Sequence, residues 1–455
     1  MARAERLSSV TQILETLGRL GAEARPRGKP RSDTVAVLDI GASKTVCLIG
    51  QRDANFDVRV LGHGFGVSGA RKAALRGGTI ADLDATESGV RSAIEKAERA
   101  AGVTVQSVAV NLSSRTLGSR HVNLSMKFAG GEITERDCAR LVRAAFARIG
   151  GAGPAQDREQ AIVHALPLSW SLDQAGGIAD PRGMFGRELG VDMHFVLAEM
   201  GALRNLAHCL ERCHLRLHGV TASPYAAGLG VLTEDELDLG CILIDIGGGV
   251  TTQAVFRDGA LLSVCALGVG GRTLTNDIAR GLSTPLEAAE RIKSIYGSAL
   301  LGADDHEVLV PCPPMASDDE LDHAPRSRLT HIVRARLEET FEILRGRLLR
   351  AGLDDYAGRR VVLTGGGAQI TGARELAEVV FERRARVGSP TYMQGLRSTL
   401  ARPDFAVAAG LLRAAFSERR DEVRGAPDLS GRLHRRTATS AHPVARSWQW
   451  LRENF

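Results

Sequence analysis

Apolar residues in this chain form two kinds of pattern: short continuous runs, and longer stretches in which they recur every three or four positions. Short runs bounded by polar residues predict buried strands, and the first of them lie at 35–40, 45–50, 58–62 and 105–112. Val90, Ile94 and Ala97 share one face at helical spacing, which predicts a helix over about 85–101. The beginning of the chain is therefore expected to form a β-β-β-α-β unit.

The same alternation continues to residue 413. Strands are predicted near 116–126 and 162–170, and helices at 135–149 and 198–213. The strand–turn–strand pattern of the first unit then returns at 241–268. After it the pattern predicts a helical region at 271–296, a loop at 311–325, a helix at 326–351, a strand at 360–363 and a helix at 405–413. This alternation is typical of an α/β protein.

The composition argues against several classes of protein. The net charge is only +5 and much of the basic excess lies near the two ends, so a nucleic-acid partner is not expected. No apolar run is long enough to span a bilayer, and the N-terminus lacks the apolar core of a secretory signal. The seven cysteines are irregularly spaced, which is typical of free thiols in a reducing cytoplasm. A length of 455 residues predicts about three domain-sized units.

Two strands, one opening each half of the chain, end in an aspartate followed by a glycine turn. The copies contain Asp39-Ile40-Gly41-Ala42-Ser43-Lys44 and Asp245-Ile246-Gly247-Gly248-Gly249-Val250-Thr251. Backbone N–H groups of such turns bind anionic oxygens, and glycine lets a ligand approach closely. Each aspartate is suited to hold the water shell of a magnesium ion. A single turn is equally well explained by a need for shape, but two copies favour facing domains that close on one nucleotide.

A third apolar strand ends in Thr364-Gly365-Gly366-Gly367. Three such turns in this order resemble those of the actin/Hsp70/sugar-kinase ATPase superfamily. The resemblance implies an actin-like two-lobed α/β fold of duplicated ribonuclease-H-like domains, in which the turns bind ATP and Asp39 and Asp245 hold Mg²⁺ through water. The implied nucleotide-binding residues are Asp39, Gly41, Ala42, Ser43, Lys44, Asp245, Gly247, Gly248, Gly249, Thr251, Gly270, Gly271, Glu290, Lys293, Gly365, Gly366 and Gly367.

Longer segments carry a closer resemblance. They lie at 77–84, 180–186, 189–196, 268–279 and 284–293. On these segments the chain, from about 35 to 413, resembles the FtsA family of bacterial actin-like cell-division proteins. The resemblance implies polymerisation, tethering of the FtsZ ring through its C-terminal peptide, and recruitment of later division proteins. It places the protein on the cytoplasmic face of the inner membrane, at the division septum.

The resemblance also implies a domain map. The expected parts are a flexible basic arm (1–32), subdomain 1A (33–113), an inserted subdomain 1C (114–199), subdomain 2A (200–272 and 346–416), subdomain 2B (273–345), a linker (417–441) and a terminal amphipathic helix (442–455).

Two departures from the superfamily pattern bear on catalysis. Relatives place Glu or Gln where Ser223 stands, and that residue orients the attacking water in faster ATPases. Many relatives also carry an acid where this chain has Thr252. Serine is a poor base, so nucleotide binding is expected with slow or negligible hydrolysis.

The last residues predict a membrane-targeting helix. Val444, Trp448, Leu451 and Phe455 fall on one narrow stripe, and Trp450 and Arg452 flank it. Such a helix lies in the headgroup plane of anionic lipids, where arginine stems reach the phosphates. The alternative is a helix docked on the protein's own core, but the Ser/Thr/Arg-rich linker before it favours the membrane.

Two other motifs are interpreted as structural. The segment 64–69 fits G-x-G-x-x-G, with Asp84 at a tempting distance, but no helix opens directly after it, as a dinucleotide site requires. The histidines and cysteines of 208–218 lie on one helix and just after it, whereas zinc ligands usually come from two turns.

Other functions remain open on the same fold. A small-molecule kinase of this superfamily needs a catalytic aspartate in an open cleft and has little use for a terminal amphipathic helix. A chaperone ATPase needs a peptide-binding domain, for which the chain after residue 413 is too short. A pilus-assembly actin homologue is a third alternative, against which the inserted subdomain and the terminal helix both count.

Overall fold

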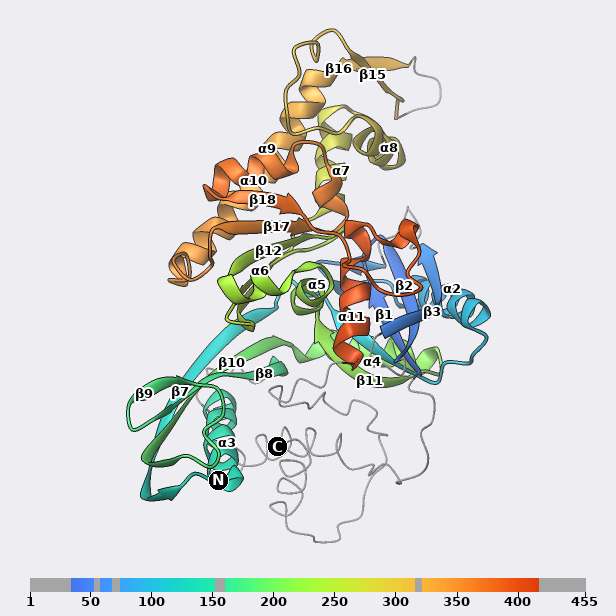
Figure 1. The fold of residues 1–455 in the computed structure, drawn as a ribbon. Helices are drawn as coiled ribbons and strands as arrows, with labels where there is room; N and C mark the ends of the chain where they lie inside the picture. The colour runs from blue at the N-terminus through green and yellow to red at the C-terminus, as the bar shows by residue number, and fades with distance from the viewer. Residues whose placement is uncertain (1–33, 53–57, 68–73, 152–159, 316–320, 417–455) are drawn as a thin grey trace, which may run out of the picture.

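The computed structural model describes residues 34–52, 58–67, 74–151, 160–315 and 321–416, and most of its strands fall into two large sheets (Figure 1). The first sheet has the strand order β11-β6-β1-β2-β3. Its strands are β1 (Thr34–Ile40), β2 (Lys44–Arg52), β3 (Val58–Val67), β6 (Ser107–Leu112) and β11 (Arg216–Ala222). β1, β2 and β3 are antiparallel, and β6 runs parallel to both β1 and β11.

The second sheet repeats this arrangement. Its first five strands follow the order β18-β17-β12-β13-β14. They are β12 (Cys241–Ile246), β13 (Thr251–Arg257), β14 (Ala260–Leu267), β17 (Arg360–Thr364) and β18 (Arg384–Val387). Again three strands are antiparallel and two are added in parallel at one edge. The chain is therefore a duplicated α/β fold with two lobes, and the expectation of an α/β class is confirmed.

A separate unit is inserted in the sequence between β6 and β11 of the first sheet, and it extends the second sheet. It consists of β7 (Gly118–Glu132), α3 (Glu135–Gly151), β8 (Gln160–Leu172), β9 (Ala175–Ile178) and β10 (Phe185–Glu199). β7 meets β14 through one pair, Gly118 with Cys265, and β10 and β8 follow. α3 packs on this sheet around a core of its own that includes Leu141, Met193 and Phe195. Figure 1 shows the unit projecting from the rest of the molecule.

The glycines of β3 serve close packing. α2 (Leu83–Ala101) begins at Asp82, whose side chain accepts from Ala85 N, and lies across β3. A Cβ at Gly64 would lie 2.1 Å from the carbonyl oxygen of Ala93, and one at Gly66 would lie as close to that of Gly89. The glycine motif at 64–69 thus begins within a strand against which a helix backbone packs, which is not the geometry of a dinucleotide turn.

Two buried helices join the lobes. α5 (Ser223–Val231) is apolar on all sides and packs against α11 (Ala406–Phe416). Their backbones touch, since a Cβ at Gly410 would lie 1.6 Å from the carbonyl oxygen of Ala226. α11 also contacts β1 and β2, while α5 contacts β12 and β13. The pair therefore fills the space between the sheets.

Two segments lie with the first sheet although the sequence placed them in the second actin-like subdomain. β11 pairs with β6, and α4 (Met200–Arg212) contacts α2 and β11. α11 packs on β1 and β2. Residues 200–222 and 406–416 thus extend the first lobe, because the strand that completes its parallel edge comes late in the chain.

Most of the remaining elements accompany the second sheet, and several of them form the upper end of Figure 1. The elements are α6 (Glu234–Leu239), α7 (Gly271–Gly281), α8 (Leu286–Tyr296), β15 (Leu309–Cys312), β16 (Asp322–Pro325), α9 (Arg326–Arg350), η2 (Gly366–Gln369), α10 (Ala373–Phe381), η3 (Ser398–Leu400) and η4 (Pro403–Phe405), with the short pair β4 (Leu75–Arg76) and β5 (Thr79–Ile80) in the first lobe. The prediction of a loop over 311–325 is wrong at both ends of this range, because β15 and β16 form an antiparallel pair there. The helical region expected at 271–296 is divided before Pro285.

In the described ranges no helix is both long and apolar enough to cross a membrane. The seven cysteines all carry free thiols, five of them buried.

Candidate nucleotide site

The two aspartate–glycine turns have the same backbone geometry. Gly41 N donates to the carbonyl oxygen of Lys44 at 3.0 Å, and Gly247 N donates to that of Val250 at the same distance. In both turns a Cβ on the first glycine would lie 2.9 Å from that carbonyl oxygen, which makes any side chain there crowded. The repeated sequence signal therefore corresponds to a repeated structure.

The first and second turns lie against each other. A Cβ at Gly248 would lie 2.2 Å from Ser43 Oγ, and one at Gly249 would lie 3.1 Å from the Cβ of Ala42. Gly249 also has the backbone nitrogens of Gly77 and Gly78 within 4.0 Å of the same position. Turns from both lobes, with N–H groups and no bulky side chains, therefore meet in one place.

The third turn lies beside the second. Gly365 has a φ of +82°, and a Cβ there would lie 2.3 Å from Asp245 Oδ1. A Cβ at Gly367 would lie 2.2 Å from the side chain of Ile246. Gly366 begins η2. Positive φ and close approach together restrict the turn to glycine.

A fourth group of predicted residues joins the second turn. Gly271 N donates to the carbonyl oxygen of Gly247 at 2.9 Å, and a Cβ at Gly270 would lie 2.5 Å from that oxygen. Lys293 Nζ donates to the carbonyl oxygen of Gly271 at 3.1 Å and pairs with Glu290 at 2.7 Å. Glu290 and Lys293 thus share one face of α8, as the sequence predicted, and Lys293 contacts the turn that starts α7.

The two aspartates of these turns lie close to each other, with Asp245 buried and Asp39 half-buried. Burial raises the pKa of Asp39 to about 6, although the positive charge of Lys44 opposes the rise. Burial raises the pKa of Asp245 to about 7, and the charge of Asp39 adds to the effect. Two neighbouring carboxyls with raised pKa values favour a bound cation or a shared proton.

Thr251 and Thr252 behave differently from each other. Thr251 is buried and its hydroxyl donates to the carbonyl oxygen of Val269 at 2.9 Å, so it fastens β13 to the segment before α7. Thr252 lies opposite Asp245 in the β12–β13 ladder, and its buried hydroxyl has no hydrogen-bond partner in the described structure. A ligand or a water molecule at this place would satisfy that hydroxyl.

The sequence did not single out two residues that position the site. Asn111, at the end of β6, accepts from Ile40 N at 2.7 Å and donates to Asp39 Oδ1 at 2.8 Å and Ser223 Oγ at 3.1 Å. Ser223, the residue in the place of a Glu or Gln, is therefore tied to Asp39 through Asn111. The available signal was a polar residue within an apolar strand run.

Asp404 is the second residue. It pairs with Lys44 at 2.5 Å and accepts from Gln369 at 3.3 Å. Lys44 Nζ also lies 3.4 Å from the ring centre of Phe405. Asp404 therefore connects the first turn with the third, and it holds the one cation of the first turn. Its partners are distant in sequence, so no local pattern marks it.

The chemistry of these residues fits a magnesium–nucleotide complex. The turns are built of glycines that leave their backbone N–H groups unshielded by side chains, and two carboxyls lie beside them. Among the described residues no cluster of three or more His, Cys, Asp or Glu side chains could hold a metal ion by itself. Mg²⁺ commonly keeps several waters and takes further oxygens from phosphate, so two carboxylates suit it.

The predicted membrane residues Val444, Trp448, Trp450, Leu451, Arg452 and Phe455 lie outside the described residues.

Duplicated sheets and facing glycine turns between two lobes define the class of actin-like proteins. A solved PilM–PilN type IV pilus biogenesis complex has this fold, with a TM-score of 0.61 over 85% of this chain and all of that chain, at 20% identity.

Comparison of sequences then identifies the family. The family model "Cell division protein FtsA" matches residues 242–410, and the model for the SHS2 domain inserted in FtsA matches residues 115–197. Cell division protein FtsA of Rhizobium meliloti is 41% identical over 94% of this chain and 98% of its own length. The Agrobacterium fabrum protein is 40% identical over 95% and 97%. The chain belongs to the FtsA family of cell-division proteins.

Proposed function

We propose that this protein is an ATP-binding, actin-like cell-division protein that polymerises at the cytoplasmic face of the inner membrane. At the division septum it tethers the FtsZ ring and recruits later division proteins. The observation that carries the nucleotide part is the meeting of three glycine turns from two lobes beside two carboxyls with raised pKa values.

In this proposal the backbone of the first two turns binds the β- and γ-phosphates. Asp39 and Asp245 hold the water shell of Mg²⁺, and Lys44 exchanges part of its contact with Asp404 for phosphate. The third turn, with Gly365, Gly366 and Gly367, supports the adenosine, and Glu290 and Lys293 border it. The bound nucleotide stabilises the closed lobes by its binding free energy.

Hydrolysis is proposed to be slow. Ser223 occupies the place of a water-orienting residue, and its hydroxyl is already engaged by Asn111 at 3.1 Å. A serine hydroxyl at this position is a poor general base. The nucleotide then acts mainly as a clamp, and the protein works as an anchor whose ATPase is weak or absent.

The membrane part rests on the sequence of residues 442–455. A single short amphipathic helix binds lipid weakly and reversibly, whereas many copies along a polymer bind strongly through effective concentration. Polymerisation would therefore make attachment durable. Subdomain 2B, at 273–345, is proposed to bind the C-terminal peptide of FtsZ, and the inserted subdomain to contribute filament contacts and to bind later division proteins.

Isothermal titration calorimetry of the full chain with ATP and Mg²⁺ tests the nucleotide site. We expect one site per chain, and the double variant Asp39→Asn, Asp245→Asn should weaken binding in the presence of Mg²⁺ by about tenfold or more, because the variant cannot hold the metal's water shell. Asp258→Asn with Asp355→Asn removes the same charge from exposed positions and should bind as the natural chain does.

An absence of heat with any magnesium–purine nucleotide would contradict the proposal. Efficient phosphoryl transfer to sugars or small acids would favour the kinase alternative instead.

A further inference from the structure

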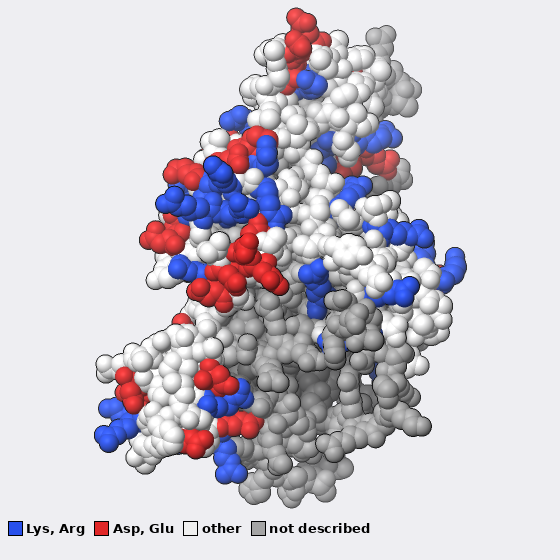
Figure 2. All heavy atoms as spheres, in the orientation of Figure 1, with Lys and Arg blue, Asp and Glu red and all other residues white. Residues whose placement is uncertain are grey.

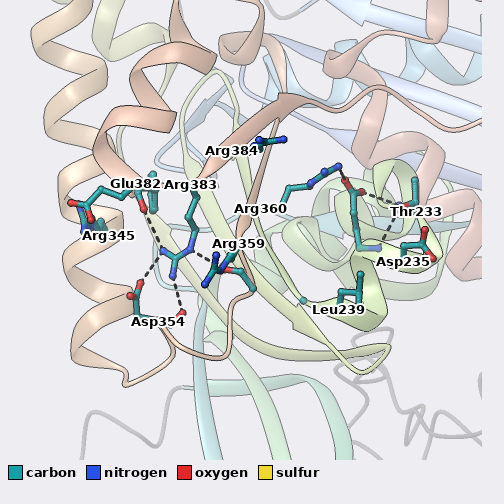
Figure 3. Close-up of a pocket in the computed structure, with 14 residues that line it drawn as sticks. Thr233, Asp235, Leu239, Arg345, Asp354, Arg359, Arg360, Glu382, Arg383 and Arg384 are labelled. Atoms are coloured by element: carbon teal, nitrogen blue, oxygen red, sulfur yellow. Dashed lines mark hydrogen bonds and ion pairs between the residues drawn. The ribbon is translucent and has the colours of Figure 1, made fainter.

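A cavity lies at the opposite end of the second sheet's strands from the glycine turns. It has a volume of about 1050 Å³ and sits at the amino-terminal ends of β17 and β18, whereas the glycine turns follow the carboxyl ends of β12 and β17 (Figure 3). α6, the end of α10 and Arg345 of α9 border it. This volume suits a molecule of several residues, larger than a lone phosphate ion.

Arginine dominates the lining. The five arginines are Arg345, Arg359, Arg360, Arg383 and Arg384. In Figure 2 basic side chains gather over this part of the second lobe, with acidic ones around them. Guanidinium groups bind carboxylates through two parallel hydrogen bonds, so a cluster of this kind recognises acidic groups with defined geometry.

Acidic neighbours hold three of these arginines. Arg345 pairs with Glu382 at 2.9 Å and Arg383 pairs with Asp354 at 2.9 Å. Arg360 lies 3.5 Å from Glu236, which is almost fully buried. These ion pairs fix the walls of the cavity.

Positive charge is left over on one wall. Glu236 also accepts from Arg386 at 2.7 Å, so one carboxylate serves two guanidinium groups. Arg384 lies opposite Arg360 in the parallel ladder of β17 and β18 and two residues before Arg386, so all three point to the same face of the sheet.

Arg384 and Arg359 have no such partner. Within the described part of the chain neither side chain forms an ion pair or a hydrogen bond, and both are exposed. Arg359 precedes β17 and Arg384 begins β18, so the two free guanidinium groups come from neighbouring strand starts. Two cations that are already in place without counter-ions favour a ligand with at least two negative charges.

The cavity also has an apolar side. Leu239, at the end of α6, is 79% exposed and borders it, and buried Phe381 also lines it. An inorganic anion would leave Leu239 in water. A segment that alternates acidic and apolar side chains would cover it.

Recognition here depends on side chains. β18 is the last strand of its sheet, but Ala385 N donates to Glu378 Oε1 at 2.9 Å, so part of its outer edge is already satisfied. Addition of a further strand is therefore disfavoured, and an extended ligand would lie across the strand starts.

We propose that this cavity binds an extended acidic segment of a partner protein, with two carboxylates on Arg359 and Arg384 and an apolar side chain over Leu239. The site is separate from the nucleotide turns, and its test does not depend on nucleotide binding.

Fluorescence anisotropy of a labelled Glu-Asp-Leu-Glu-Asp peptide with the full chain tests the proposal. We expect saturable binding that weakens with salt, and no binding of a Gln-Asn-Leu-Gln-Asn peptide of equal length. Arg359→Glu with Arg384→Glu should weaken binding about tenfold or more, and Leu239→Ser should weaken it several-fold.

The matched control is Arg99→Glu with Arg216→Glu, which makes the same charge change at exposed positions of the first lobe and should leave binding unchanged. Thermal midpoints of all variants show that the fold is intact. Equal loss in both double variants would mean general charge attraction and would overturn the proposal. An absence of saturable peptide binding would also overturn it. So would a result in which the pocket variants weaken the binding of inorganic phosphate or of phosphatidylglycerol vesicles but leave the binding of the peptide unchanged.

Discussion

At the scale of single residues, the site is controlled by charged groups that are buried or half-buried. Asp39 and Asp245 lie at equivalent places in two copies of one turn, so the duplication itself brings two carboxyls together. Asn111 fixes Asp39 from the side, and Asp404 holds Lys44. When no cation is bound, the ionised carboxylates of Asp39 and Asp245 destabilise the folded state.

The stability of the ligand-free protein should fall as the pH rises. The pKa values of Asp39 and Asp245 are raised in the folded state from 3.8 to about 6 and about 7. The folded state therefore holds protons that the unfolded state has lost, and its stability declines between about pH 4 and pH 7. Asp39→Asn with Asp245→Asn removes this dependence, so near pH 7.5 the variant should be more stable by at least about 1 kcal/mol.

Thermal melts in EDTA, without nucleotide, at pH values from 4 to 8 measure this difference. If the thermal midpoints of the two proteins change with pH in the same way across this range, burial does not raise the pKa values of the two carboxyls.

At the scale of elements, glycine decides how close two backbones come. The residues Gly62, Gly64 and Gly66 alternate along β3, and all three face α2. A Cβ at any of them would lie within 2.5 Å of a carbonyl oxygen of that helix. α2 is well capped, by Asp82 at its start and by Gly102, with a φ of 68°, at its end, so it cannot shift easily.

Gly64→Val should therefore destabilise the first lobe. Overpacking of this kind typically costs about 1–3 kcal/mol, which corresponds to a fall of several degrees in the thermal midpoint. Gly219→Val is the control, because a Cβ at Gly219 of β11 meets nothing within 4 Å. If circular dichroism melts show the same loss for both variants, strand glycine as such, and not the contact with α2, is the cause.

At the scale of the whole molecule, two lobes are joined by a buried helix pair and closed by facing turns. α5 and α11 touch through Gly410 and Ala226, and turns from both sheets meet at Ser43 and Gly248. A ligand between the turns would change the relation of the lobes. In the proposed function, a polymer of such molecules presents many copies of the predicted terminal helix to one membrane.

Sedimentation with liposomes checks the membrane attachment. The full chain should pellet with vesicles that contain anionic phosphatidylglycerol, and more of it should pellet with ATP and Mg²⁺, because assembly adds avidity. A chain that ends at Ala441 should stay in the supernatant. Equal pelleting of the two chains would refute the anchor, and a variant with Trp448→Ala and Leu451→Ala separates loss of apolar contact from loss of length.

Much of this was accessible from the sequence because it depends on local pattern. Apolar runs placed β1, β2, β6, β12 and β17 within a residue or two, and aspartate–glycine turns marked the ends of β1 and β12. Strand ends and glycine turns follow from backbone preferences, and these act over a few residues. The resemblance to the ATPase superfamily depended on the same turns, and the closer resemblance to the FtsA family depended on longer segments such as 268–279.

The tertiary structure alone decided which distant residues became neighbours. It placed β11 beside β6, paired Lys44 with Asp404 and tied Ser223 to Asp39 through Asn111. It also left Arg359 and Arg384 without an ion-pair partner among the residues that the structure describes. The local pattern of a single sequence does not indicate which distant residues pair, because the free energy of these contacts depends on burial and distance in the folded chain. Side-chain type and local spacing are written in the sequence, whereas the environment that gives each side chain its charge and its partner exists only after folding.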